Sequence, residues 1–299
     1  MSLPIPDLLT VVDPRPLVRA AARQSFGEAP GRPIVDGGRA VGVRHESADA
    51  TYCFLEEIVP ADLRASGEAQ TVSVFETIER ILHAEGMTFG HLVRTWFYLD
   101  KILDWYDGFN RARTPFLQAR GAFDGLLPAS TGIGMPNRHG AAVIGGALAI
   151  ARKGATVQEV PSPLQCSALD YRSAFSRAVE VARKGRRELY ISGTASIEPG
   201  GKTAHVGDAS AQIGLTMQVA EALLRSRGMD WNHCTRAVAY LKQPEYAPLF
   251  ARHLAAHGLG TLPLTWMHAD VCRDDLLFEI ELDASLKLDP ARATARCGG

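Results

Sequence analysis

Apolar residues recur along this chain with helical and strand periods in a regular succession. The first helical period is formed by four residues, Phe75, Ile78, Ile81 and Leu82. Positions three and four apart share one face of a helix, so this spacing predicts an amphipathic helix. Gly86 follows the last of them, and a glycine just beyond a helix favours a left-handed cap. The pattern therefore predicts a helix that ends before Gly86.

Strand-like segments surround this helix. The stretch 92–99 is rich in aromatic and β-branched residues and follows the glycine, which predicts a strand. A second helical period, a turn marked by a proline and a closing strand come next, and two segments before the first helix predict a hairpin. The predicted unit is ββαβαβ. Its remaining segments are the hairpin 39–46 with 51–60, the second helix 105–117, the turn 127–131 and the closing strand 141–150.

The same succession occurs twice. Residues 70–99 align with residues 212–241 without a gap, at a constant offset of 142 residues. Identities fall at chemically unlike positions, which composition alone does not produce. They include Gln70 with Gln212, Gly86 with Gly228, Arg94 with Arg236 and Tyr98 with Tyr240. The chain is therefore interpreted as an internal duplication.

Helices packed on one face of a mixed sheet define the α+β class, and we expect two such units in tandem. The join is placed where two prolines interrupt the periodicity. The C-terminal unit is expected to hold the active site, and the N-terminal unit is expected to be a degenerate scaffold. The predicted boundaries are a lead-in at 1–38, an N-terminal unit at 39–152, a linker at 153–162, a C-terminal unit at 163–288 and a tail at 289–299.

Composition and charge narrow the class of protein. A chain of 299 residues with 46% hydrophobic and 22% charged residues is long enough for two globular domains. The net charge of −1 gives no basic field for nucleic acid or anionic lipid. No apolar run is long enough for a membrane span, and the start lacks a signal-peptide pattern. Five dispersed cysteines suit free thiols, so we expect a cytoplasmic protein without a metal site.

Two motifs in the second half indicate a family. They are LYISGTASIEPGGKTAHVGD at 189–208 and HADVCRDDLLFEIELDA at 268–284. The single unit resembles the RidA/YjgF-like fold, which belongs with the chorismate-mutase-like folds. Two such units in tandem with these motifs resemble the chorismatases over residues 40–287. That resemblance implies cleavage of the enolpyruvyl ether of chorismate to pyruvate, without a metal or organic cofactor, by a monomer or homotrimer.

Glu279 is the predicted general acid. An enol ether breaks down once its methylene carbon is protonated, and a carboxyl group with a raised pKa suits that step. Glu279 lies among Leu277, Phe278 and Ile280, where burial disfavours the anion. Glu281 points to the same side of the strand and is the alternative acid. An exposed glutamate paired with a base across the sheet is the structural alternative.

The two repeats can be compared at these positions. Aligning the closing strands places Glu279 opposite Gly145 and Glu281 near Ala147. The N-terminal copy therefore has neither acid. A glutamate kept for solubility is expected on either copy, so the asymmetry favours a catalytic role for Glu279.

Cys272 is the predicted product selector, and this assignment follows from the resemblance. Members with a cysteine at this position release an aromatic hydroxybenzoate, here 3-hydroxybenzoate. A mixture with 4-hydroxybenzoate and a dihydroxycyclohexadiene carboxylate are the alternative products. A thiol is chemically suited to assist opening of an epoxide formed on the ring. A lone cysteine is also a common small buried hydrophobic residue.

A dianionic substrate calls for cations and hydrogen-bond donors, and seven residues are candidates. Arg177 has no counterpart in the other repeat and is the preferred carboxylate clamp. Arg236 shares its position with Arg94, which favours a structural role. The other candidates are the phenols of Tyr171 and Tyr190, the backbone of Gly193 and Thr194, and Asp208, which equally suits a helix cap. An imine deaminase and a non-catalytic carboxylate-binding protein are the alternative functions.

Overall fold

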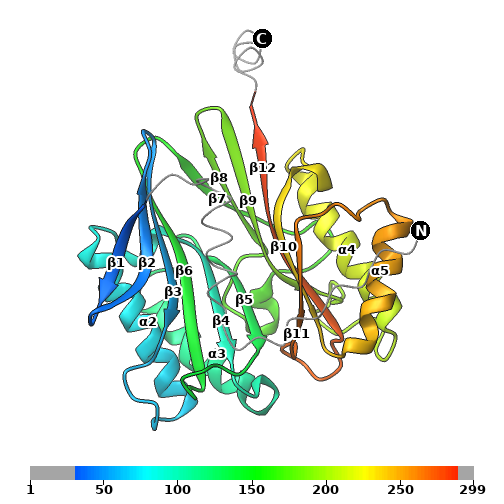
Figure 1. Ribbon diagram of the computed structural model, residues 1–299, viewed down its shortest axis with the longest axis horizontal. Helices are drawn as coiled ribbons and strands as arrows, with labels where there is room; N and C mark the ends of the chain where they lie inside the picture. Colours follow the sequence, from blue (N-terminus) through cyan, green and yellow to red (C-terminus); the bar gives the residue numbers. More distant parts are fainter. Residues whose placement is uncertain (1–30, 289–299) are drawn as a thin grey trace.

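The computed structural model describes residues 31–288, so the first thirty residues of the predicted lead-in and the predicted tail at 289–299 lie outside it. Two six-stranded mixed sheets face each other, and two helices cover the outer face of each sheet (Figure 1). The predicted α+β fold class is confirmed. The first unit comprises β1 (Arg32–Asp36), β2 (Arg39–Glu46), β3 (Ala50–Ile58), α2 (Gly67–Ala84), β4 (Leu92–Leu99), α3 (Ile102–Gln118), β5 (Ala129–Gly134) and β6 (Val143–Arg152).

The second unit repeats the first in both element order and sheet order. Its sheet runs β7-β8-β9-β12-β10-β11, and the first runs β1-β2-β3-β6-β4-β5. The pairs β4–β5 and β10–β11 are parallel, and the other pairs are antiparallel. The elements are β7 (Thr156–Val160), β8 (Ala178–Arg183), β9 (Arg186–Ala195), α4 (Ala209–Ser226), β10 (Cys234–Leu241), α5 (Ala247–Ala256), β11 (Leu264–His268) and β12 (Phe278–Lys287).

Each observed unit has two strands more than the predicted ββαβαβ. Strands β1 and β7 are edge strands of five residues, and β7 lies within the segment 153–162 that we expected to be a linker. Strands β5 and β11 follow the turn prolines directly. A short strand at a sheet edge contains few alternating apolar and polar residues. Its sequence therefore lacks the two-residue period by which longer strands are predicted. The domain boundaries themselves stay a prediction.

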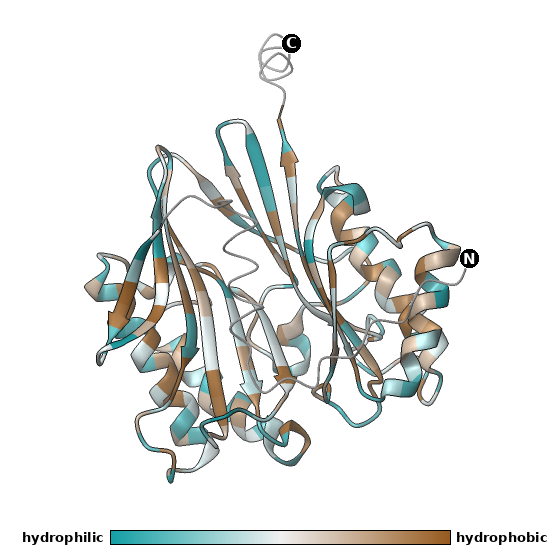
Figure 2. Ribbon diagram, in the orientation of Figure 1, coloured by the Kyte–Doolittle hydropathy of each residue, from teal (hydrophilic) through white to brown (hydrophobic). Residues whose placement is uncertain are grey.

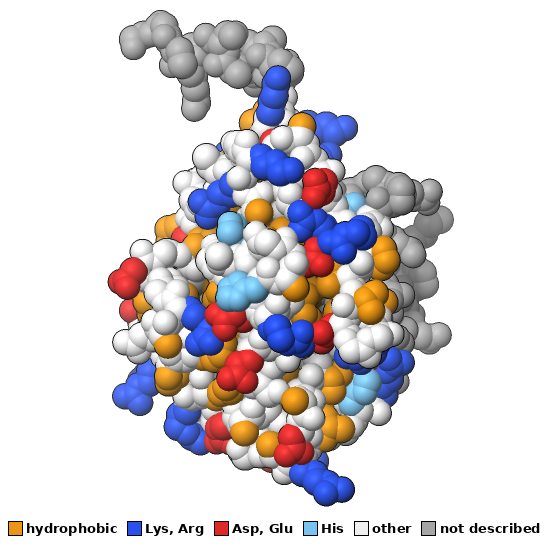
Figure 3. Space-filling model, turned by 90° about the vertical axis from the view of Figure 1, so that its left-hand side faces the viewer, with side chains coloured by type: hydrophobic (Ala, Val, Ile, Leu, Met, Phe, Trp, Pro, Cys, Tyr) orange, Lys and Arg blue, Asp and Glu red, His pale blue; other side chains and the backbone are white. Residues whose placement is uncertain are grey.

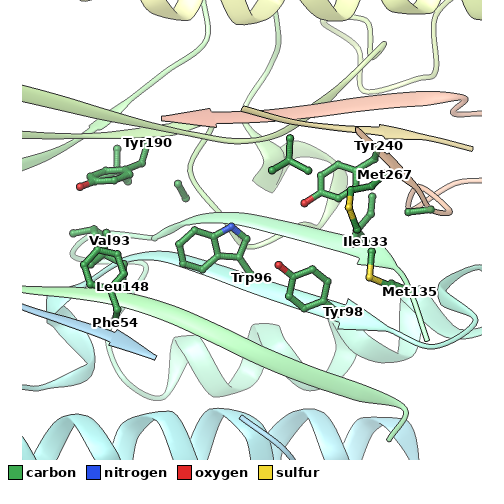
Figure 4. Close-up of a cluster of buried hydrophobic side chains, with 14 of the residues drawn as sticks. Phe54, Val93, Trp96, Tyr98, Ile133, Met135, Leu148, Tyr190, Tyr240 and Met267 are labelled. Atoms are coloured by element: carbon green, nitrogen blue, oxygen red, sulfur yellow. The ribbon is translucent and has the colours of Figure 1, made fainter. Parts of the chain in front are cut away.

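The apolar core consists of three layers. One lies between α2, α3 and the first sheet, a second lies between the two sheets, and a third lies between the second sheet and helices α4 and α5. Hydrophobic colour alternates with paler positions along the strands in Figure 2. Figure 4 shows Trp96 and Tyr98 of β4 pointing toward Tyr190 and Tyr240 of the opposite sheet. Each sheet is therefore buried on both faces, by its helices on one side and by the other sheet on the opposite side.

The ends of the first helices confirm one prediction from the sequence. Gly86 follows α2 with a φ of +73°, and Gly228 follows α4 with a φ of +68°. Both values lie in the left-handed region, which glycine adopts without a Cβ clash.

Figure 3 shows the side of the molecule that lies at the left of Figure 1, where acidic and basic side chains lie interspersed. Ion pairs of the first unit include Arg80 with Asp36 and Arg120 with Glu79. Among residues 31–288, no helix is long and apolar enough to cross a membrane.

Candidate active site

A cavity lies where the two units meet, with about 430 Å³ of space including its open mouth. The second unit lines it with five of the predicted site residues, Tyr171, Arg177, Gly193, Cys272 and Glu279. The first unit contributes four residues of α3 and β5, namely Tyr106, Arg113, Ser130 and Gly132. The N-terminal unit, which we expect to be a degenerate scaffold, therefore also forms one wall of this cavity through its second helix and its edge strand.

Glu279 is buried in this cavity near the start of β12. The residue is only 4% exposed, and its backbone is paired with Tyr240 of β10 and Ala195 of β9. Burial, and then the negative charge of Glu281, raise its pKa to about 8, while Arg177 opposes the shift. Glu279 is therefore mostly protonated at neutral pH, which is the state that a general acid requires.

The alternation of β12 separates its acids from its apolar residues. Phe278, Ile280 and Leu282 pack against helices α4 and α5. Glu279 and Glu281 therefore point into the layer between the two sheets. This placement explains why a strand with two glutamates is buried along its whole first half.

The structural pairing corrects the alignment of the closing strands by one residue. Tyr98 and Tyr240 are equivalent, and they pair with Ile144 and Glu279 respectively. The counterpart of Glu279 is thus Ile144 rather than Gly145, and that of Glu281 is Gly146 rather than Ala147. The register of a strand is set by cross-strand pairing, which the separate sequences do not display. The N-terminal copy still has no acid at either position.

Glu281 lies in a buried ion-pair network. Arg94 donates to its Oε2 at 2.9 Å, Trp96 donates to its Oε1 at 3.1 Å, and Arg236 forms a further ion pair. Although burial alone would raise it, Arg236 and Arg94 hold the pKa of Glu281 at about 2. Glu281 is therefore a permanent anion beside Glu279 and is not suited to donate a proton.

Arg236 serves this network and does not line the cavity. Its guanidinium also contacts Asp283 at 3.3 Å, and Arg94 reaches Asp283 at 3.8 Å. The duplicated arginines therefore converge on two acids that only the second unit carries. This favours the structural role that the duplication suggested for Arg236.

Arg177 presents an unsatisfied donor to the cavity. Its Nε donates to the carbonyl of Cys166 at 3.0 Å, and its buried Nη2 has no hydrogen-bond partner among the described residues. The rings of Tyr171 and Phe175 lie 5.2 and 5.7 Å from its guanidinium carbon. A buried cation with a free N–H group is suited to bind a carboxylate.

Arg113 is a second buried cation in the cavity, and the sequence interpretation missed it. It is 2% exposed, and its guanidinium carbon lies 4.9 Å from the Phe109 ring and 5.9 Å from the Phe175 ring. Its position between Phe109 and Phe116 places an arginine within the apolar stripe of α3. A charged residue within an apolar stripe is the sequence feature that could have indicated a buried functional arginine.

Cys272 lies in the loop between β11 and β12. Burial, and then the charge of Glu279, raise the pKa of its thiol to about 12, so the thiol stays protonated. The preceding Asp270 is tied to the end of β5, because Gly134 N–H donates to the Asp270 carbonyl at 2.7 Å. The first unit thus also helps to hold the loop that carries the thiol.

Three further candidates lie outside the lining of this cavity. Tyr190 packs in the layer between the sheets. The hydroxyl of Thr194 donates to the carbonyl of Ser192 at 2.8 Å. Asp208 caps α4, where its carboxylate accepts from Ala211 N–H at 2.9 Å, so its capping alternative is the one observed.

The fold and the site together define a tandem α+β protein with a cavity between its units, and that cavity is lined by one buried acid and two buried arginines. Residues 32–146 match the family model of the chorismatase FkbO/Hyg5-like N-terminal domain. A "Chorismatase" of Streptomyces hygroscopicus is 28% identical over 64% of this chain and 60% of the relative, so less than two thirds of that relative is spanned. A "3-hydroxybenzoate synthase" of the same organism is 28% identical over 78% of this chain and 74% of the relative.

A solved structure agrees with these matches. A crystal structure of a chorismatase superposes with a TM-score of 0.67 and 23% identity, covering 85% of this chain and 80% of that one. This likeness supports the fold. The resemblance predicted from the two motifs is confirmed, because the chain is similar to chorismatases in both comparisons of sequence.

Proposed function

We propose that this protein is a chorismatase that converts chorismate to pyruvate and 3-hydroxybenzoate. The observation that carries the proposal is a protonated, buried Glu279 in one cavity with Arg113 and Arg177. Chorismate has two carboxylates, and the two guanidiniums match them in number and carry the opposite charge. The names of the related proteins support the same reaction.

Glu279 supplies the proton that starts the reaction. Transfer of that proton to the methylene carbon creates an oxocarbenium ion at the carbon bearing the ether oxygen. The 4-hydroxyl of the ring then displaces the ether oxygen at carbon 3, pyruvate leaves, and an epoxide remains. The proton that this hydroxyl loses balances the one that Glu279 gave. Arg177 and Arg113 hold the carboxylates while this charge develops.

Cys272 acts on the epoxide in this proposal. Its protonated thiol is a weak acid that assists opening of the carbon 4–oxygen bond, which leaves the oxygen on carbon 3. Loss of the proton on carbon 3 then gives the aromatic ring and restores the proton balance. Without this assistance, water opens the epoxide, and this addition yields the dihydroxycyclohexadiene carboxylate.

The proposal is tested by the products that the purified protein makes from chorismate. We expect pyruvate and 3-hydroxybenzoate in equal amounts, measured by a coupled pyruvate assay and by mass and ultraviolet spectra. Binding of chorismate without pyruvate release would point to a binding protein and contradict the proposal. On the same proposal the protein works on this small dianion in the cytoplasm, as a monomer or homotrimer.

Cys272→Ala is expected to change the ring product. Pyruvate should still form, because Glu279 remains, while the ring product shifts toward the dihydroxycyclohexadiene carboxylate. Chromatography of the products with mass detection measures the ratio. Cys166→Ala is the matched control, since Cys166 is also a half-buried free thiol but does not line the cavity. Unchanged 3-hydroxybenzoate as sole product from Cys272→Ala refutes the role of the thiol.

A further inference from the structure

Thr131 of strand β5 connects the surroundings of both glutamates. It belongs to the first unit, and it is 1% exposed. Its hydroxyl donates to the Oε2 of Glu281 and accepts the backbone N–H of Gly193 at 3.1 Å. Arg94 approaches the same hydroxyl oxygen at 3.4 Å. A threonine hydroxyl can donate one hydrogen bond and accept two. The hydroxyl of Thr131 therefore has all the hydrogen-bond partners that it can take.

Gly193 forms the surface on which the Glu279 carboxyl rests. A methyl group at Gly193 would collide with the Oε1 of Glu279. The pairing of β9 with β12 is irregular between Ile280 and Leu282, opposite this glycine. Glycine therefore permits direct contact between the backbone of β9 and the carboxyl of β12.

The Gly193 N–H group is thus a hydrogen-bond donor on the same residue that the carboxyl of Glu279 rests against. Among residues 31–288, no group donates a hydrogen bond to the carboxyl of Glu279. A buried N–H without an acceptor is costly, and an adjacent carboxylate would satisfy it. Donation to the ionised form of a carboxyl lowers its pKa. The choice of acceptor for this one amide therefore affects how firmly Glu279 keeps its proton.

We propose that Thr131 is a positioning residue that holds the Gly193 N–H and so withholds it from the Glu279 carboxyl. The inference rests on the proposed function, because it concerns the acid of that reaction. It assigns the first unit a part in the chemistry, since the hydroxyl comes from β5. Through its bond to Glu281, Thr131 also holds in place the anion whose charge opposes ionisation of Glu279.

The test compares Thr131→Val with Thr131→Ser. In the valine variant the freed amide turns to Glu279, and we expect the pKa of Glu279 to fall by about one unit. Carboxyl-carbon NMR titration of the free protein measures it, with the signal assigned through Glu279→Gln. The basic limb of the kcat profile should move down equally, which reduces kcat at pH 8 about five-fold. Thr131→Ser keeps the hydroxyl and should restore both values.

Thr71→Val is the matched control. Thr71 is fully buried in α2 and its hydroxyl donates to the Gly67 carbonyl at 2.8 Å, away from the cavity. It should lose stability without moving the pKa of Glu279. Thr131→Ala removes the same hydroxyl without the added methyl and must reproduce the shift. An unchanged Glu279 pKa in both Thr131 variants overturns the inference, even where Glu279→Gln is inactive and the proposed function holds.

Discussion

Glu279→Gln is expected to reduce pyruvate release from chorismate by about 10³-fold or more, in the upper range for loss of a general acid. Glutamine fills the same space against Gly193 but has no acidic proton to give to carbon. Arg113 and Arg177 remain, so chorismate should still bind. A coupled pyruvate assay measures the rate, and calorimetry measures the binding. Pyruvate release at the wild-type rate would refute the assigned acid.

Although Glu279→Gln should lose activity, we expect it to be more stable than the wild type at high pH. Because the pKa of Glu279 is raised to about 8 in the folded protein, its contribution to stability is complete below the unfolded pKa near 4.5 and is lost as pH rises through 8. Glutamine does not ionise. At pH 9 the variant should therefore be more stable than the wild type, by on the order of 5 kcal/mol at most. Equal stability at that pH contradicts the raised pKa.

Glu281→Gln is expected to destabilise the fold by about 3–5 kcal/mol, because it leaves two buried arginines with one acid between them. Arg94 and Arg236 are 0% and 2% exposed, so water does not replace the lost charge. The melting temperature should fall by on the order of 10 °C. Since the pKa of Glu281 is depressed to about 2, this stabilisation is present above the unfolded pKa and lost as pH falls toward 2.

Glu180→Gln is the control for this second prediction. Glu180 is also buried between two arginines, Arg227 at 2.6 Å and Arg187 at 3.5 Å. Both arginines reach solvent, with side chains 28% and 25% exposed, so losing their partner costs them less. Chemical denaturation of both variants at pH 7 makes the comparison. A loss below about 1 kcal/mol for Glu281→Gln shows that the network contributes no more than a surface pair.

Much of the fold was predictable because it depends on local periodicity. The strand 92–99 was predicted with the bounds that the structure has, since aromatic and β-branched residues fill it. The caps at Gly86 and Gly228 follow from glycine's conformational freedom. Edge strands β1 and β7 were missed because a short strand that is buried on few positions carries no clear period.

The candidate site was predictable only within one unit. Glu279, Cys272 and Arg177 belong to distinctive motifs or lack a counterpart in the other repeat, and they lie in one cavity. Arg113 comes from the first unit. Nothing in the sequence of its own helix indicates that it lies in a cavity with residues of the second unit. Arg236 was ambiguous because its partner Glu281 is distant in sequence and Arg94 is more distant still.

The sequence by itself determined the duplication, the α+β class, the family resemblance and the presence of acids in only one of the two closing strands. Only the tertiary structure decided which of two neighbouring glutamates has a raised pKa and which has a lowered one. Both point to the same side of β12, so their local patterns do not distinguish them. Arginines from both units surround Glu281, whereas burial dominates at Glu279. A pKa is set by desolvation and by nearby charges in space, and those neighbours are brought together by the packing of one repeat on the other.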